Sequence, residues 1–175
     1  MTTWVLLAPG PSADKVNLDG VSFLPLGAIS NAFQLAPWAQ FVAASDAAWW
    51  RKYPEALKFP ERYAMAPAGG VERVFSKFGN PCNSGVLALE VAKKKGAKRV
   101  ILLGFDMHGT HFFGPYTNGL SNTQPYRRRI HLKQYGDWAK ANPQISVVNC
   151  TPGSALTCFQ MARIEDVADL QRASA

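Results

Sequence analysis

The chain has 175 residues, of which 47% are hydrophobic and 18% charged, and its formal net charge is +7. This length fits one globular domain over residues 1–175, and the composition excludes a disordered chain. No apolar run reaches about 18 residues, the N-terminus does not resemble a signal peptide, and the three cysteines are scattered. We therefore expect a cytoplasmic protein with no membrane partner and no zinc site.

Strand-like and helix-like segments alternate along the chain. This order predicts an α/β fold: a single Rossmann-like domain whose mainly parallel sheet has helices on both faces. The expected strands are residues 3–8, 21–26, 41–44, 62–66, 100–104 and 145–150. The expected helices are a short one within 28–37, then 46–57, 86–95, 126–142 and one that begins near residue 164. Proline and glycine predict a loop over 67–82, and the loop over about 107–125 is long enough to be functional.

Small polar residues and glycines follow the expected strands. The carboxyl ends of parallel strands share one edge of the sheet, where ligands of such folds bind. Glycine lets a phosphate approach the backbone, and the free N–H groups at a helix start attract anions. The residues that we expect at this edge are Gly10, Pro11, Ser12, Ser30, Asn31, Ser45, Asp46, Asn83, Ser84, Gly85, Asp106, Thr151, Pro152, Gly153 and Ser154. Each has an ordinary alternative role as a turn or helix-cap residue, so the prediction rests on the whole set.

The 107–125 loop holds the candidate catalytic groups. His108 and His111 lie close to Asp106, and either histidine has a pKa suited to a general base. A metal held by these three side chains is a weaker alternative. His131 follows Arg127 in the next helix and is expected at the surface. The loop aromatics, Phe112, Phe113, Tyr116 and Tyr126, either stack on a ligand base or pack the loop itself.

Two basic clusters account for much of the positive charge. Residues 93–99 surround a helix end, where cations suit the helix dipole, and we interpret them as solvated. Residues 127–133 border the loop, and Arg127 could reach a ligand phosphate. Because the sequence has no recognition-helix motif, charge alone supports nucleic-acid binding, and we do not expect it. The P-loop and G-x-G-x-x-G patterns are absent as well.

The sequence resembles two related families. It has an early strand that ends in G-P-S, an Asn after the second strand, and the pattern N-S-G-x-x-A-L-x-x-A-x-x-x-G-x-x-x-V-x-L-x-G-x-D over residues 83–106. This arrangement is similar to that of bacterial sialyltransferases, which use CMP-sialic acid, and of the MptE-like 6-hydroxymethylpterin diphosphokinases. Small phage-encoded proteins of unassigned function also resemble it, including a late strand that ends in C-T-P-G-S.

The resemblance to sialyltransferases implies a nucleotide site. By position, Gly10, Pro11, Ser12, Asn31, Ser84 and Gly85 would contact the CMP part of the donor. Residues 150–154 would match a further segment near the nucleotide. The family's base is a histidine that closes an H-[YF]-x-G-H stretch after a lid. In this chain residues 111–116 read H-F-F-G-P-Y, so Tyr116 stands near the missing histidine. His111 or His108 would then serve as the base, with Tyr126 or Arg127 steadying the leaving phosphate.

Three functions follow as hypotheses. The leading one is a nucleotide-dependent transferase with a CMP-sugar-like, glycosyltransferase-type donor. The second is a diphosphokinase of the pterin type, which would need Mg²⁺ held by Asp106 and Asp46. The third is a phage-type module that binds a nucleotide without turnover, as the missing second histidine suggests.

Overall fold

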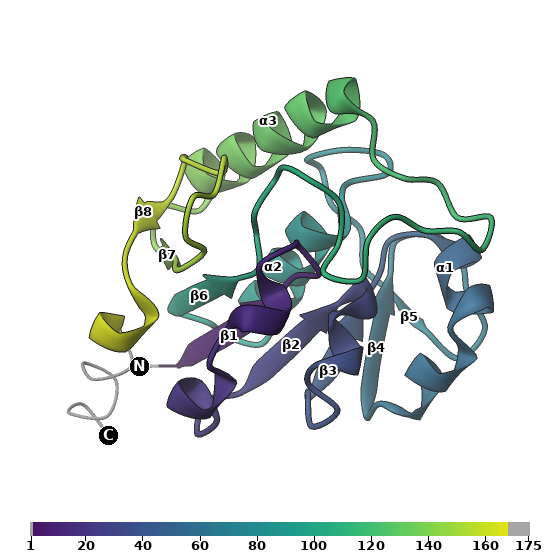
Figure 1. Ribbon diagram of the computed structural model, residues 1–175, viewed down its shortest axis with the longest axis horizontal. Helices are drawn as coiled ribbons and strands as arrows, with labels where there is room; N and C mark the ends of the chain where they lie inside the picture. The colour runs from purple at the N-terminus through teal and green to yellow at the C-terminus, as the bar shows by residue number, and fades with distance from the viewer. Residues whose placement is uncertain (1, 168–175) are drawn as a thin grey trace.

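The computed structural model describes residues 2–167, which form one sheet of eight strands in the order β5-β4-β3-β2-β1-β6-β7-β8 (Figure 1). Every neighbouring pair is parallel. The strands are β1 (Thr3–Leu7), β2 (Leu26–Ile29), β3 (Phe41–Ala43), β4 (Glu61–Ala64), β5 (Glu72–Arg73), β6 (Arg99–Leu103), β7 (Ser146–Asn149) and β8 (Gln160–Met161). The predicted Rossmann-like α/β fold is therefore confirmed. Within residues 2–167, no helix is long and apolar enough to cross a membrane.

The two faces of the sheet are covered by different kinds of element. Side chains alternate along β1, so Trp4 and Leu6 join one core, while Val5 and Leu7 join the other. The first core is closed by α2 (Ser84–Lys94) and α3 (Pro125–Ala141). The second is closed by α1 (Ala47–Lys52) and the 3₁₀ helices η1 (Ala13–Lys15), η2 (Leu18–Val21), η3 (Ser30–Gln34) and η4 (Pro54–Lys58). Helices do lie on both faces, but those on the second face are short.

The strand predicted at residues 21–26 is wrong. Residues 18–21 form the 3₁₀ helix η2, and β2 begins only at Leu26. Pro25 has no N–H to give to a strand ladder, so the strand starts directly after it. A second proline splits the helix predicted over 46–57. There α1 ends at Lys52, and η4 begins at Pro54.

Other boundaries also differ from the predictions. The helix expected within residues 28–37 is the 3₁₀ helix η3, with Ser30 and Asn31 inside it rather than at its N-cap. β4 spans 61–64 rather than 62–66, and the 67–82 loop contains the two-residue strand β5. β8 was not predicted, because two residues give no periodicity. The C-terminal helix begins at residue 164 as expected, and residues after 167 lie outside the described range.

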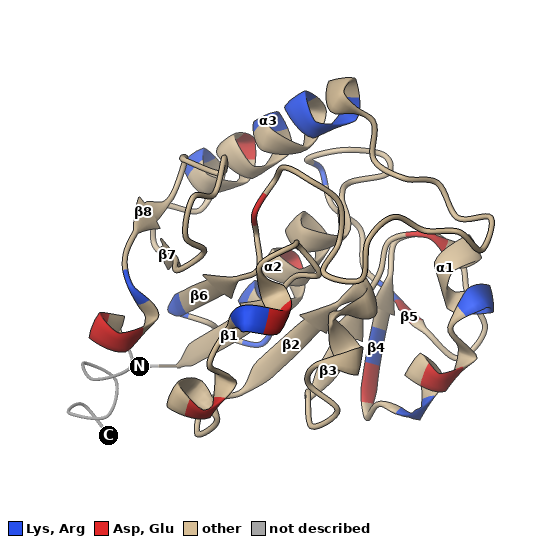
Figure 2. Cartoon of the chain, in the orientation of Figure 1, with Lys and Arg blue, Asp and Glu red and all other residues tan. Residues whose placement is uncertain are grey.

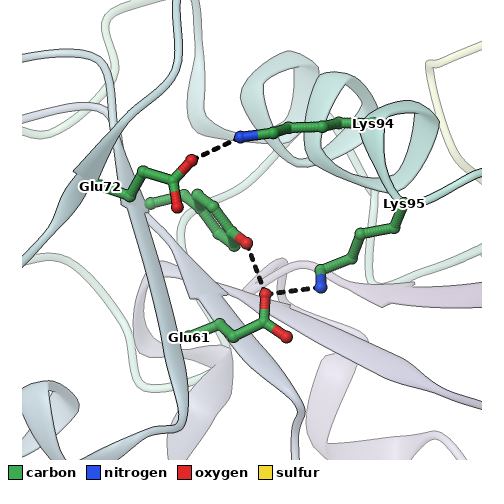
Figure 3. A network of polar contacts seen from close by, with 5 residues as sticks. Glu61, Glu72, Lys94 and Lys95 are labelled. Atoms are coloured by element: carbon green, nitrogen blue, oxygen red, sulfur yellow. Dashed lines mark hydrogen bonds and ion pairs between the residues drawn. The ribbon is translucent and has the colours of Figure 1, made fainter.

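Two lysines at the C-terminal end of α2 are ion-paired rather than simply solvated. Lys94 binds Glu72 of β5 at 2.5 Å, and Lys95 binds Glu61 of β4 at 2.5 Å (Figure 3). The Tyr63 hydroxyl donates a short hydrogen bond to the same Glu61 carboxylate. Burial raises the pKa of Glu61, but the hydrogen bonds from Lys95 and Tyr63 outweigh it, so the pKa is lowered overall. The network ties the end of α2 to the β4–β5 edge of the sheet.

Candidate functional site

The strand order reverses between β1 and β6. From β1 the chain runs outward through β2, β3, β4 and β5, then crosses back to place β6 on the other side of β1. In open parallel sheets, ligands bind in the crevice beyond the carboxyl ends of the strands at such a reversal. The segments that leave β1 and β6 begin at Ala8 and Gly104, so they flank the place where a site is expected.

The turns after β1 and β6 touch through their glycines. The Gly10 N–H donates to Gly104 O at 3.0 Å. A Cβ on Gly10 would lie 2.1 Å from Asp106 Oδ2, and one on Gly104 would lie 2.3 Å from Ala8 O. Gly104 also has a φ of +71°, which favours glycine. Both glycines are therefore explained by the close approach of the two turns to each other, and neither needs a phosphate as its reason.

Asp106 is held from one side only. Ser12 donates twice to its Oδ2 atom, from Oγ at 2.9 Å and from the backbone N–H at 3.3 Å. The side chain is 3% exposed. Among residues 2–167, no donor contacts Oδ1. The predicted site residues Ser12 and Asp106 thus come together and leave one carboxylate oxygen free to accept a hydrogen bond.

At the end of β2, Asn31 leaves a hydrogen-bond donor unused, whereas Asp106 leaves an acceptor unused. Its Oδ1 atom accepts from Trp49 Nε1 at 2.8 Å and from the Tyr116 hydroxyl at 2.7 Å. An amide oxygen has two lone pairs, so both are used. The side chain is 1% exposed, and no acceptor in the described part of the chain takes its Nδ2 hydrogens. Asn31 therefore offers a free donor. The preceding Ser30 has a φ of +45°, a strained conformation for this residue type.

At the start of α2, the side chains make hydrogen bonds within the protein, while two backbone N–H groups make none. Asn83 is the N-cap: its Oδ1 accepts from Val86 N at 3.0 Å, and its Nδ2 donates to Gln134 at 2.8 Å. Ser84 Oγ accepts from Ser45 N at 3.0 Å, which fixes α2 beside the end of β3. Within the described residues, the backbone N–H groups of Ser84 and Gly85 have no acceptor. Such N–H groups favour an anion.

In the segment from Thr151 to Ser154, the side-chain hydroxyl groups are used in hydrogen bonds within the protein. Thr151 Oγ1 accepts from Phe105 N at 2.9 Å, and Ser154 Oγ donates to Phe105 O at 2.5 Å. Ser154 Oγ also accepts from Asn149, a fully buried residue of β7 that the sequence analysis did not single out. The signal for Asn149 was an amide inside an apolar strand. This segment supports the end of β6, and Pro152 and Gly153 are exposed beside it.

The 107–124 loop lies across the carboxyl edge, from the end of β6 past α1 to α3 (Figure 1). Phe112 N donates to Pro9 O at 3.1 Å, and Arg128 makes a short hydrogen bond to Gly109 O. On the far side, Asn118 Nδ2 donates to the Tyr53 hydroxyl at 3.1 Å. The loop is therefore fastened to the ends of β1 and α1. Its rings pack on one another, with His111 stacked on Phe113 at 4.8 Å.

Both candidate histidine bases in this loop already contact backbone carbonyl groups of the protein. His111 Nδ1 contacts Gly114 O at 3.2 Å, and His108 Nε2 contacts Gly153 O at 3.2 Å. Burial lowers the pKa of His111; the contact with Gly114 O raises it and Arg128 lowers it further. Burial raises the pKa of the Tyr116 hydroxyl, which is opposite to what a general base requires. Each of these groups has a structural role in the loop.

His131 was expected at the surface, but it is half-buried. Burial lowers its pKa, Arg127 lowers it further and Asp46 raises it. Tyr126 and Arg127 themselves are exposed on the first turns of α3, where Figure 2 shows a group of basic residues. Among the described residues, Arg127 forms no ion pair with a carboxylate, so its guanidinium can bind an anion.

Asp46 and Asp106 do not come together. Asp46 follows β3 and Asp106 follows β6, which lie three strand positions apart. At about 4.8 Å per position, the ends of these strands are about 14 Å apart. One Mg²⁺ ion has ligands at about 2 Å and could not bind both carboxylates. No group of three or more His, Cys, Asp or Glu within residues 2–167 is suited to a metal.

Two hollows on the surface lie away from the reversal point. One, of about 340 Å³, is lined by residues of α1, η4 and the 67–69 turn. The other, of about 300 Å³, is lined by residues of η3 and η4 with their flanks. Neither includes a predicted site residue. The 107–124 loop, which is bonded to the ends of β1 and α1, runs along this edge of the sheet.

Comparison of the chain with protein families, with curated proteins and with solved structures finds no match. The resemblance to sialyltransferases and pterin diphosphokinases stays a hypothesis.

Proposed function

We propose that the protein binds a nucleotide across the carboxyl ends of β3, β2, β1 and β6. The observation that carries the proposal is the pair of nearly buried groups with unused hydrogen-bonding capacity, Asn31 Nδ2 and Asp106 Oδ1. Their strands lie on either side of β1, so the strand ends are about 10 Å apart. A ligand that meets both must be elongated, as a nucleoside is, and the free N–H groups of Ser84 and Gly85 suit its phosphate.

We further propose that the nucleotide serves as a donor in group transfer, as the resemblance to sialyltransferases implies. The 107–124 loop lies over the crevice, and excluding water protects an activated donor from hydrolysis. Binding without turnover is the second candidate, because both loop histidines contact carbonyls of the protein. The separation of Asp46 from Asp106 gives no support to the Mg²⁺-dependent diphosphokinase.

A thermal-shift screen tests nucleotide binding. The purified protein is heated with CMP, CDP, UDP, GDP, ATP, GTP or NAD, with and without Mg²⁺. A ligand at 100 times its Kd adds about 2.7 kcal/mol to stability, and we expect CMP to raise Tm. If no nucleotide raises the Tm of the folded protein, the proposal is wrong. A nucleotide that binds is then supplied as its sugar conjugate, and release of free nucleotide separates a transferase from a binding module.

Asp106→Asn shows whether binding occurs at the proposed place. The amide can still accept from Ser12 through its oxygen, while its NH₂ group replaces the free acceptor Oδ1. We expect the nucleotide-induced shift to disappear with little change in the Tm of the free protein. Asp14→Asn is the matched control: it makes the same chemical change at an exposed carboxylate of η1 and should retain the shift. Equal shifts in the two variants would place the ligand elsewhere.

A further inference from the structure

The Asn31 side chain is held by two donors from different parts of the chain. Trp49 comes from α1, and Tyr116 comes from the 107–124 loop. The indole N–H can only donate, so the atom facing Trp49 must be the amide oxygen. The Tyr116 hydroxyl can adapt to either partner, but with Trp49 in place it also meets the oxygen. The orientation of the amide is therefore determined by its surroundings.

This orientation has a consequence for the ligand. We propose that Trp49 and Tyr116 are positioning residues that direct the NH₂ group of Asn31 to the ligand, so that the ligand atom recognised at the end of β2 is a hydrogen-bond acceptor. Ser12 does the converse for Asp106 by donating twice to Oδ2, so the ligand group recognised at the end of β6 is a donor. The ligand class thus carries an acceptor at one end and a hydroxyl or amino group at the other. The application to a nucleotide rests on the proposed function.

The surroundings of Tyr116 keep its hydroxyl in the donor role. The ring packs against His111 at 4.6 Å, Phe113 at 5.3 Å and Tyr53 at 6.4 Å. Burial raises the pKa of this hydroxyl, so it stays protonated and able to donate. The ring contacts hold Tyr116 in place without the hydroxyl, which makes Tyr116→Phe a change of one hydrogen bond. Trp49 is 4% exposed and packs on Phe33 and Trp50, so its indole is equally fixed.

The orientation can be tested without any ligand. In ¹⁵N-labelled protein, the side-chain NH₂ protons of Asn31 should exchange with water, while the Trp49 indole proton should be protected by its 2.8 Å bond. Asn31→Asp keeps an oxygen for Trp49 and Tyr116, and the charged acceptor should move the indole proton resonance downfield. An exchanging indole proton beside protected Asn31 protons would show the reverse orientation and overturn the inference.

The ligand role is tested by titration with CMP. We expect Asn31→Asp to weaken binding more than 10-fold, since the free donor at the end of β2 becomes an acceptor. Tyr116→Phe should weaken it about 2- to 12-fold, the range that one hydrogen bond of about 0.5–1.5 kcal/mol gives. Asn17→Asp makes the same chemical change at an exposed residue outside the site, where it can still cap Asp19 N, so it is the control and should bind as the natural chain does.

The outcomes separate the two proposals. If Asn31→Asp binds CMP normally while the indole resonance moves as expected, the NH₂ group does not meet the ligand, and the inference is wrong. If Tyr116→Phe binds normally and Asn31→Asp does not, Tyr116 is not a positioning residue. If the natural chain binds no nucleotide, the proposed function fails, and the exchange experiment alone still decides the orientation of Asn31.

Discussion

Two half-buried histidines, His111 and His131, make stability depend on pH. Burial lowers the pKa of His111 and of His131 below their usual value of 6.5. Between the two pKa values, the unfolded chain binds more protons than the folded one, so stability increases with pH there. The stabilisation is complete above about pH 7 and is lost as the pH falls through the lowered values.

We therefore expect the free energy of unfolding to decrease from pH 7 to pH 5. His111→Gln and His131→Gln should each flatten this decrease, since glutamine is polar but does not titrate. Urea unfolding at several pH values measures the effect. A slope that is the same in both variants and in the natural chain would contradict this assignment.

Sequence reasoning placed Ser12, Asn31 and Asp106 at the correct edge, because the carboxyl ends of parallel strands must meet there. It could not show which atoms each residue leaves free. Asn31 was expected to cap a helix, whereas its oxygen meets Trp49 and Tyr116, far away in the sequence. Thr151 and Ser154 carry the residue types of a phosphate turn, but both hydroxyl groups are taken by Phe105. Such partners depend on tertiary contacts that local patterns do not contain.

At the scale of one element, α2 depends on its cap. Asn83→Ala removes the acceptor of Val86 N and the partner of Gln134. We expect it to lower the free energy of unfolding by about 1–2 kcal/mol in urea denaturation. Asn83→Asp keeps an oxygen for Val86 N and should cost less. An equal loss in both variants would mean that the contact with Gln134, rather than the cap, stabilises this helix start.

The helices and strands predicted best are those whose formation depends on residues within the same segment of the chain. Helix α2 follows from a capping residue, an apolar face and a glycine stop, and its predicted start and end differ by a residue or two from the observed ones. Strand β2 was misplaced because the apolar run around Pro25 looked continuous, although proline interrupts the ladder. The two-residue strands β5 and β8 form only because neighbouring strands offer them an edge. No pattern within two residues can predict that.

For the whole molecule, the contact between the turns after β1 and β6 limits what the fold tolerates. Gly104→Ala would place a Cβ 2.3 Å from Ala8 O on a backbone with positive φ. We expect it to cost about 2–5 kcal/mol of stability and to separate the two turns. Gly136→Ala is the control, because nothing lies within 4 Å of the added Cβ in α3. It should increase stability by about 0.5–1 kcal/mol in the same urea experiment.

The reversal of strand order also means that β1 is synthesised long before one of its two partner strands. Thr3 of β1 pairs with Arg99 of β6, so one side of the first strand waits for a partner made roughly 95 residues later. At about 5–20 residues per second, the ribosome takes about 5–20 seconds to supply it. During that time β1 can pair only with β2, and the N–H and C=O groups of its other edge stay unpaired. A nascent chain shorter than about 100 residues therefore exposes the strand that later becomes the centre of the sheet, which makes this interval the one in which a holdase chaperone would protect the chain most.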